Sequence, residues 1–161
     1  MLETIRTLWK YNSWAMERFL AELDAFTEEE FLRELDKGSG SLRDKLAHIC
    51  GADEVWLRRI QGEVSPAFPT ITDFVDRAAV AKRARAVHAE YRALLESLTD
   101  SDLNRAHSYK NLKGVDFTTP LWQILMHVAN HATYHRGQAA SIIRRIKGKP
   151  PVTDLIEYFR S

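Results

Sequence analysis

Three of the six histidines in this chain form a regular series, His127, His131 and His135, inside the stretch LWQILMHVANHATYHRGQAASIIRR at residues 121–145. Four residues of an α-helix turn through about 400° and rise about 6 Å, so the three imidazoles should form one row along a helix. Two imidazoles at this spacing can bind a single metal ion, which explains why HxxxH recurs in helical zinc sites. The alternative is a set of core histidines, each with its own hydrogen-bond partner.

The aliphatic residues around this row indicate which side of the helix faces the core. They recur at steps of three and four residues, as in an amphipathic helix, and are Ile124, Val128, Ala132, Ala139, Ile142 and Ile146. On a helical wheel His131 and His135 fall on this face, with Gln138 beside them. Two imidazoles there need either buried partners or one shared cation, and a metal site needs a third ligand from elsewhere. His48 is the best candidate because it is the only histidine in the first half of the chain.

Composition limits the class of protein. With 161 residues, 45% hydrophobic and 28% charged, the chain is most simply one domain, residues 1–161. A formal charge of +1 gives no electrostatic footprint for nucleic acid. No apolar run approaches the about 20 residues of a membrane span, and MLETIRTLWK lacks a signal-peptide layout, so we expect a cytoplasmic protein without a membrane partner. The single cysteine, Cys50, excludes an internal disulfide and a multi-cysteine metal site.

Four long stretches have helical periodicity, with glycines and prolines between them. They cover approximately residues 3–23, 42–62, 73–98 and 121–145. Ser41 with Asp44 resembles a capping box, and Thr119 with Pro120 predicts the start of the last helix. The segments 106–109 and 115–117 flank NLKG and fit a small hairpin. The sequence therefore predicts an all-α four-helix bundle with a small hairpin before the last long helix.

Other polar residues on these elements have structural interpretations. Asn12 lies in the apolar stripe of the first helix, so its side chain should bond to the backbone or face a polar cavity. His88 borders the inward face of the third helix, and we interpret it as structural or exposed. His107, in the hairpin, is expected to be exposed, and the apolar residues at 155–159 should fold back onto the bundle.

The sequence resembles the DinB/YfiT-like superfamily of four-helix metal proteins in three segments. These are YNSWAMERFL, GSLRDKLAHICGADEVWLRRIQG and TTPLWQILMHVANHATYHRGQAASIIRRIKGKPPVTDLIEYF, of which HVANHATYHRGQ is the most specific part. The resemblance implies a bundle, commonly a homodimer, whose divalent metal is held by a histidine of the second helix and the HxxxH pair before RGQ. Those positions here are His48, His131 and His135. His127 matches a histidine that relatives often carry one turn earlier, near the metal or lining the pocket.

A metal held by three histidines keeps a coordination position for water or substrate. Zinc is the default ion, and nickel also suits imidazole ligands. Some members of the family resemble enzymes that transfer a low-molecular-weight thiol, such as bacillithiol, mycothiol or glutathione, to an electrophile, which implies a small-molecule substrate. The side chains available to orient that substrate are Asn12, His127, Tyr134 and Gln138.

Two other functions use the same three ligands. The first is metal-dependent hydrolysis, which needs an acid or base nearby. Asp53 is available, although it lies well around the helix from His48, and no glutamate follows His131 as in the metalloprotease helix. The second is a stress-induced protein that binds metal for structure or sensing and catalyses no reaction.

Overall fold

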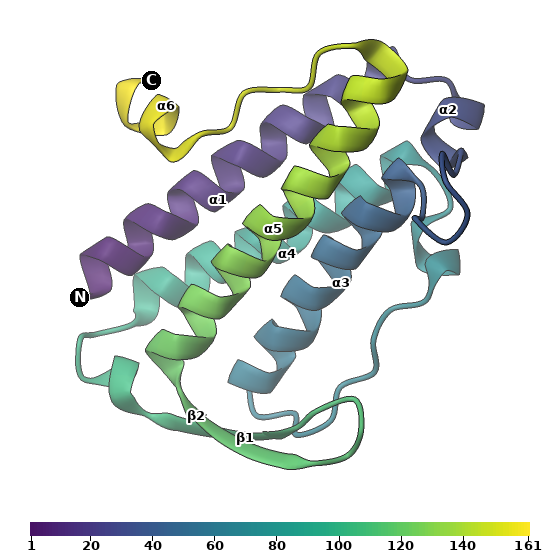
Figure 1. The fold of residues 1–161 in the computed structure, drawn as a ribbon. Coiled ribbons are helices and arrows are strands. Elements are labelled where there is room, and N and C mark those ends of the chain that lie inside the picture. Colours follow the sequence, from purple (N-terminus) through teal and green to yellow (C-terminus); the bar gives the residue numbers. More distant parts are fainter.

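The computed structural model describes residues 1–161 and contains four long helices. They are α1 (Leu2–Glu22), α3 (Leu42–Ile60), α4 (Arg77–Ser97) and α5 (Leu121–Lys147). In Figure 1, α5 packs against α1 and α3, and α4 packs against the same two helices from behind. Helices α1 and α5 run in one direction and α3 and α4 in the other, so a long connection returns from the end of α3 to the start of α4. The predicted all-α four-helix bundle is confirmed. No helix combines the length and the hydropathy that crossing a membrane requires.

Shorter elements connect and cover the long helices. They are the 3₁₀ turns η1 (Leu23–Ala25), η2 (Ile71–Phe74) and η3 (Asp102–Asn104), the helices α2 (Glu28–Leu32) and α6 (Leu155–Arg160), and the strands β1 (Ala106–Lys110) and β2 (Asp116–Pro120). The two strands pair antiparallel, which confirms the predicted hairpin. The hairpin is attached to α3 by Arg59, whose Nη2 donates to the carbonyl oxygen of Lys110 at 2.7 Å.

Capping side chains set where two of the long helices begin. Ser41 and Asp44 form the predicted capping box of α3: the Asp44 N–H donates to Ser41 Oγ at 3.2 Å and the Ser41 N–H to the Asp44 carboxylate at 2.9 Å. Helix α4 begins at Arg77, later than predicted, because Thr70 and Asp73 form a capping box around the separate turn η2.

The hairpin differs from the prediction at two points. Strand β2 extends through Pro120, so α5 begins at Leu121 and not at the proline. His107 is buried rather than exposed, with 9% of its surface accessible. Strand alternation explains this burial, because Ala106 and Ser108 face solvent and the side chain between them faces the opposite side.

The C-terminal segment returns to the bundle only in part. Helix α6 lies beside α1 (Figure 1), where the rings of Tyr158 and Tyr11 have centroids 5.9 Å apart. The Tyr11 hydroxyl also donates to the carbonyl oxygen of Thr153 at 2.8 Å. The predicted folding back is therefore confirmed for Tyr158, whereas the exposed apolar residues of this segment are Leu155, Ile156 and Phe159.

The core contains two apolar clusters, one toward α2 and one toward the hairpin. Four buried polar side chains, one from each long helix, join the helices to one another, and we call this set the polar layer: Asn12, Asp53, His88 and Arg136. Arg59 is also buried on α3 but bonds to the hairpin. Arg136 Nη1 donates to Asn12 Oδ1, which joins α5 to α1. The ring of His88 and the carboxylate of Asp53 lie 3.1 Å apart, which joins α4 to α3. The polar layer thus connects the four helices in two pairs.

Candidate metal centre

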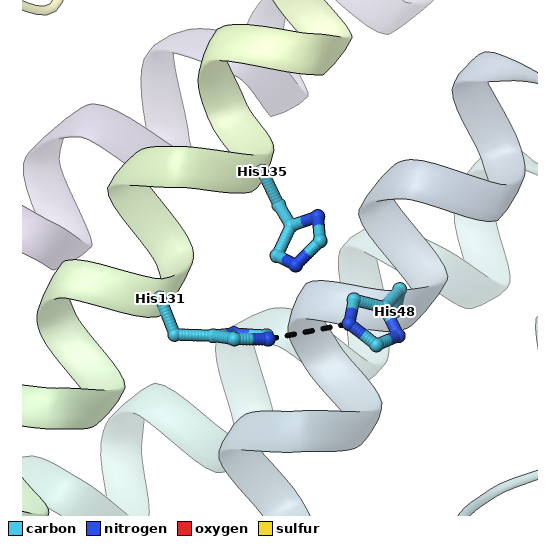
Figure 2. Close-up of side chains that lie close together, drawn as sticks. All are labelled: His48, His131 and His135. Carbon is cyan, nitrogen blue, oxygen red and sulfur yellow. Dashed lines mark hydrogen bonds between the residues drawn. The ribbon is translucent and has the colours of Figure 1, made fainter. Parts of the chain in front are cut away.

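Three histidine side chains meet between α3 and α5. His48 comes from α3, while His131 and His135 come from successive turns of α5 and face it (Figure 2). The Nε2 atoms of His48 and His131 lie 3.2 Å apart. One ligand atom from each of the three side chains lies within 4.8 Å of the others. Two nitrogens bound tetrahedrally to zinc at about 2.0–2.1 Å are about 3.3 Å apart, so the cluster has the dimensions of a site for one ion.

A hydrogen bond fixes the orientation of His135. Its Nδ1–H donates to Gln138 Oε1 at 2.8 Å, one turn further along α5. The proton on Nδ1 leaves Nε2 with a free lone pair, and Figure 2 shows a ring nitrogen of His135 facing the space between the other two rings. Gln138, predicted either to contact substrate or to support a metal ligand from behind, thus contacts the ring of His135.

The surroundings lower the pKa of two of the rings, those of His131 and His48. Burial lowers the pKa of His131 to about 4, helped by the charge that His135, His48 and His127 would carry. Burial also lowers the pKa of His48, as do His135 and Lys45. Neutral imidazole is the form that binds metal, so both rings are available at neutral pH.

An aromatic side chain covers one side of the cluster. Phe68, in the connection between α3 and α4, stacks on His48 with ring centroids 5.6 Å apart. This approach depends on Gly51, since a Cβ there would lie 2.7 Å from Cε1 of Phe68. Sequence reasoning missed both residues. The glycine in the middle of a predicted helix was the available signal, because such glycines often allow a close approach.

Two other predicted residues border the cluster on α5. His127 is exposed, with its ring centroid 5.9 Å from that of His131 and 5.2 Å from that of Trp56. Tyr134 is 65% exposed and contacts His135 edge-on, with centroids 5.0 Å apart. Both side chains are therefore next to the cluster and accessible to a substrate.

Asn12 and Asp53 have partners in the polar layer. Asn12 is fully buried and accepts a hydrogen bond from Arg136, so it bonds to a side chain rather than to the backbone. Asp53 is also fully buried and is held by His88. Burial raises the pKa of Asp53, while the hydrogen bond and charge of His88, and the charge of Arg136, oppose that rise. Neither side chain forms a hydrogen bond with the three histidines.

The fold and the site together define a class of protein: a four-helix bundle with a three-histidine cluster between two of its helices. The family model of the DinB family matches residues 1–161, and the chain belongs to the DinB family. Protein DinB of Bacillus subtilis strain 168 is 23% identical over 143 residues, which cover 86% of this chain and 83% of that protein.

Solved structures share the fold. A DinB-like protein from Bacillus cereus ATCC 10987 has a TM-score of 0.71 at 25% identity, covering 93% of this chain and 96% of its own. YfiT from Bacillus subtilis is described as a probable metal-dependent hydrolase with an unusual four-helix bundle topology. It has a TM-score of 0.70 at 15% identity, covering 89% of this chain and 88% of its own. At 15% identity, this similarity shows only that the two proteins share a fold.

Proposed function

We propose that His48, His131 and His135 hold one divalent metal ion, zinc or nickel. We further propose that the protein is a single-domain, metal-dependent enzyme that transfers a low-molecular-weight thiol to an electrophile. The observation that carries this proposal is the meeting of three imidazole nitrogens from two helices within 4.8 Å.

The donor set fits such an ion better than it fits a group of core histidines. Core histidines satisfy both ring nitrogens with hydrogen bonds, but Nδ1 of His131 is buried without a protein partner. The Nε2 atoms of His48 and His131 lie 3.2 Å apart, close to the separation of two ligands on one ion, so a cation there would accept a lone pair from each ring. Imidazole nitrogens suit both zinc and nickel.

When bound, the ion would lower the pKa of a thiol or water and act as a Lewis acid toward an electrophile. The protein's own contribution is orientation and exclusion of solvent. Gln138 holds His135 in one tautomer, and Phe68 covers His48. We assign His127 and Tyr134, which are exposed beside the cluster, to contacts with the substrate.

The lack of a carboxylate at the cluster favours thiol transfer over hydrolysis. His48 bonds only to His131, and His135 only to Gln138. The carboxylate of Asp53 is hydrogen-bonded to His88 instead. A thiol has a pKa of about 8.5 and needs little further activation, whereas free water, at about 15.7, needs much more.

Hydrolysis is the second candidate, because YfiT, which shares the fold, is described as a probable metal-dependent hydrolase. In that case His127 is the side chain placed to act as acid or base, since it is exposed one turn from His131. Replacing His127 with Ala separates the two reactions. The change should remove hydrolysis of ester or amide substrates but reduce thiol transfer only through weaker substrate binding.

Elemental analysis of the purified protein tests the metal proposal. We expect about one zinc or nickel per chain, complete loss in His131→Ala, and retention in His88→Ala and His107→Ala. The cobalt or nickel form should then show a thiolate charge-transfer band with added thiol. Equal metal loss in all three variants would contradict the assignment of the ligands.

Metal removal separates an enzyme from a non-catalytic metal protein. A structural site contributes folding free energy, so chelation would unfold the chain. An open catalytic site on a preformed bundle should keep its circular dichroism spectrum after chelation and lose only thiol binding. A metal-free protein that unfolds and a metal form that binds no thiol would together contradict the enzyme proposal.

A further inference from the structure

A groove of about 870 Å³ lies between α1 and α4 and does not include the three histidines of the candidate metal centre. Its size falls within the about 300–1,000 Å³ of small-molecule sites. The metal proposal does not use it, since the candidate centre lies between the other two helices, α3 and α5.

Polar contacts tie α1 to α4 at both ends of the groove. At one end Arg85 Nη2 lies 3.0 Å from the Glu17 carboxylate. At the other, Arg6 Nε donates to the carbonyl oxygen of Leu95 at 3.0 Å, and its Nη1 pairs with Glu3. These contacts hold the two helices at a fixed separation, so the space between them is part of the fold.

The floor of the groove carries an imidazole backed by a buried carboxylate. His88 lines the groove with only 6% of its surface exposed, and its Nε2 lies 3.1 Å from Asp53 Oδ2. A neutral ring that donates this proton to Asp53 has an acceptor lone pair on Nδ1, which forms no hydrogen bond within the protein. Trp9 completes the floor, stacked on Tyr91 with centroids 3.9 Å apart. The rings of His88 and Trp9 are thus held in place before a ligand binds.

Two cations without acidic partners face the middle of the groove. Because α1 and α4 run antiparallel and Glu17 lies opposite Arg85, the same register places Lys10 opposite Arg92. Both side chains are exposed, whereas Arg6 and Arg85 are paired with glutamates.

The remaining lining residues give the groove a polar and an apolar side. Ser13 and the half-buried Trp14 line it on α1, next to Lys10. Glu96, the glutamate without an ion pair, lies toward the end that Arg6 closes. The centre therefore combines positive charge, an indole and a buried acceptor.

We propose that this groove binds a small aromatic organic anion, separately from the metal centre. Its acidic group pairs with Lys10 and Arg92, its ring packs on Trp14, and a hydroxyl or amine donates to Nδ1 of His88. This arrangement uses both unpaired cations and the free imidazole nitrogen at the centre of the groove.

Calorimetric titration with 4-hydroxybenzoate tests the proposal, and two analogues separate its parts. Benzoate lacks the donor to His88 and should bind about fivefold more weakly, the worth of one neutral hydrogen bond. The uncharged 4-hydroxybenzamide lacks the pairing with Lys10 and Arg92 and should bind at least tenfold more weakly, because hydrogen bonds to charged groups are stronger.

Variants then locate the binding. The double change Lys10→Ala and Arg92→Ala should weaken 4-hydroxybenzoate binding at least tenfold, and it alters only exposed helix positions. Lys82→Ala removes an exposed cation of α4 outside the groove and should leave binding unchanged. The metal-loaded and metal-stripped proteins should bind 4-hydroxybenzoate equally. A groove that binds no probe therefore contradicts this proposal without bearing on the metal centre.

Three binding results would overturn the assignment. They are no saturable binding at millimolar 4-hydroxybenzoate, equal binding by the double variant, or no preference among the three probes. A dimer that Lys10→Glu with Arg92→Glu dissociates would also overturn it, since the groove would then be covered by a second copy of this chain.

Discussion

The protein contains two kinds of histidine environment, and they differ in whether the ring has a carboxylate partner. His48, His131 and His135 lie half-buried between α3 and α5 without a carboxylate partner. His88 lies buried in the polar layer with its ring on Asp53. A ring that already has a carboxylate is satisfied by the fold. The three rings of the cluster have no carboxylate and only Gln138 as an outside partner, so they remain available to a cation.

We expect the two environments to serve different purposes, the polar layer stability and the three-histidine cluster function. The His88 and Asp53 pair joins α4 to α3 inside the bundle, so its loss leaves an uncompensated polar group in the core. The three-histidine cluster lies where solvent can reach it, and its rings make few bonds that the fold requires. We therefore expect changes in the polar layer to lower stability and changes in the cluster to lower metal affinity.

The largest effect should come from Asp53→Ala. Removing one partner of a buried pair costs about 3–5 kcal/mol, because His88 stays buried without its acceptor. Urea unfolding monitored by circular dichroism measures this loss. The fraction of Asp53→Ala that remains folded should still hold about one metal ion per chain.

His48→Ala is the matched change in the other environment. In the metal-stripped protein it should alter the free energy of unfolding by less than about 1 kcal/mol, because His48 is partly exposed. The same variant should lose the metal. If His48→Ala destabilised the metal-free protein as much as Asp53→Ala, the separation of stability from function would be wrong.

Gln138→Leu should weaken metal binding without removing it. The change deletes the acceptor that fixes His135 in the tautomer with a free Nε2. Loss of such an outer partner typically lowers metal affinity about 10–100-fold. Competition with a chromophoric chelator measures the affinity, and Gln138→Glu, which keeps an acceptor oxygen, should preserve it. Equal affinities of wild type and Gln138→Leu would show that the tautomer is set by other contacts.

The part of the cluster on α5 was predictable from the sequence because the information is local. His48 is 83 positions from His131, and it was reached only through the family resemblance and as the one histidine in the first half of the chain. His131 and His135 are one helical turn apart, so periodicity alone places them on one face. The capping box at Ser41 and Asp44 is equally local, and it fixed the start of the helix that carries His48. The long helices follow from patterns of this kind.

The polar layer was not predictable, because its partners are distant in the sequence. Asp53 and His88 are 35 positions apart, and Asn12 and Arg136 are 124 apart. Helical periodicity shows that each faces inward or borders the core, but the partner depends on how the helices pack. The burial of His107 was missed for the same reason, because the strand face that turns inward depends on where the hairpin docks.

Gly51→Ala should disturb the cluster through Phe68. The new Cβ would lie 2.7 Å from the Phe68 ring, so the ring must leave its place on His48. We expect a loss of about 1–3 kcal/mol, as for other overpacked sites, together with a change in the cobalt spectrum of the metal centre.

Gly137→Ala is the control, because Gly137 is also a helical glycine but a Cβ added there would meet nothing within 4 Å. It should raise stability by about 0.4–1 kcal/mol, since alanine restricts the unfolded chain. A stabilising Gly51→Ala would mean that Phe68 can move aside without cost.

The smallest effect should appear in the pH dependence of the metal-stripped protein. The pKa of His131 is lowered to about 4 in the folded state, against about 6.5 for an unfolded histidine. Between these values the unfolded chain binds a proton that the folded protein does not, so the free energy of unfolding falls as the pH falls. One proton limits the slope to about 1.4 kcal/mol per pH unit, and solvent around a half-buried ring reduces it further.

Urea unfolding between pH 7 and pH 4 measures this slope, with His131→Gln as the comparison. Glutamine does not titrate, so the variant should lose stability less steeply over the same range. Bound metal competes with the proton for the same ring, so the metal-loaded protein should be more stable at neutral pH and lose that advantage on acidification. A slope unchanged by His131→Gln would assign the titration to other groups and would remove the electrostatic distinction between the cluster and the polar layer.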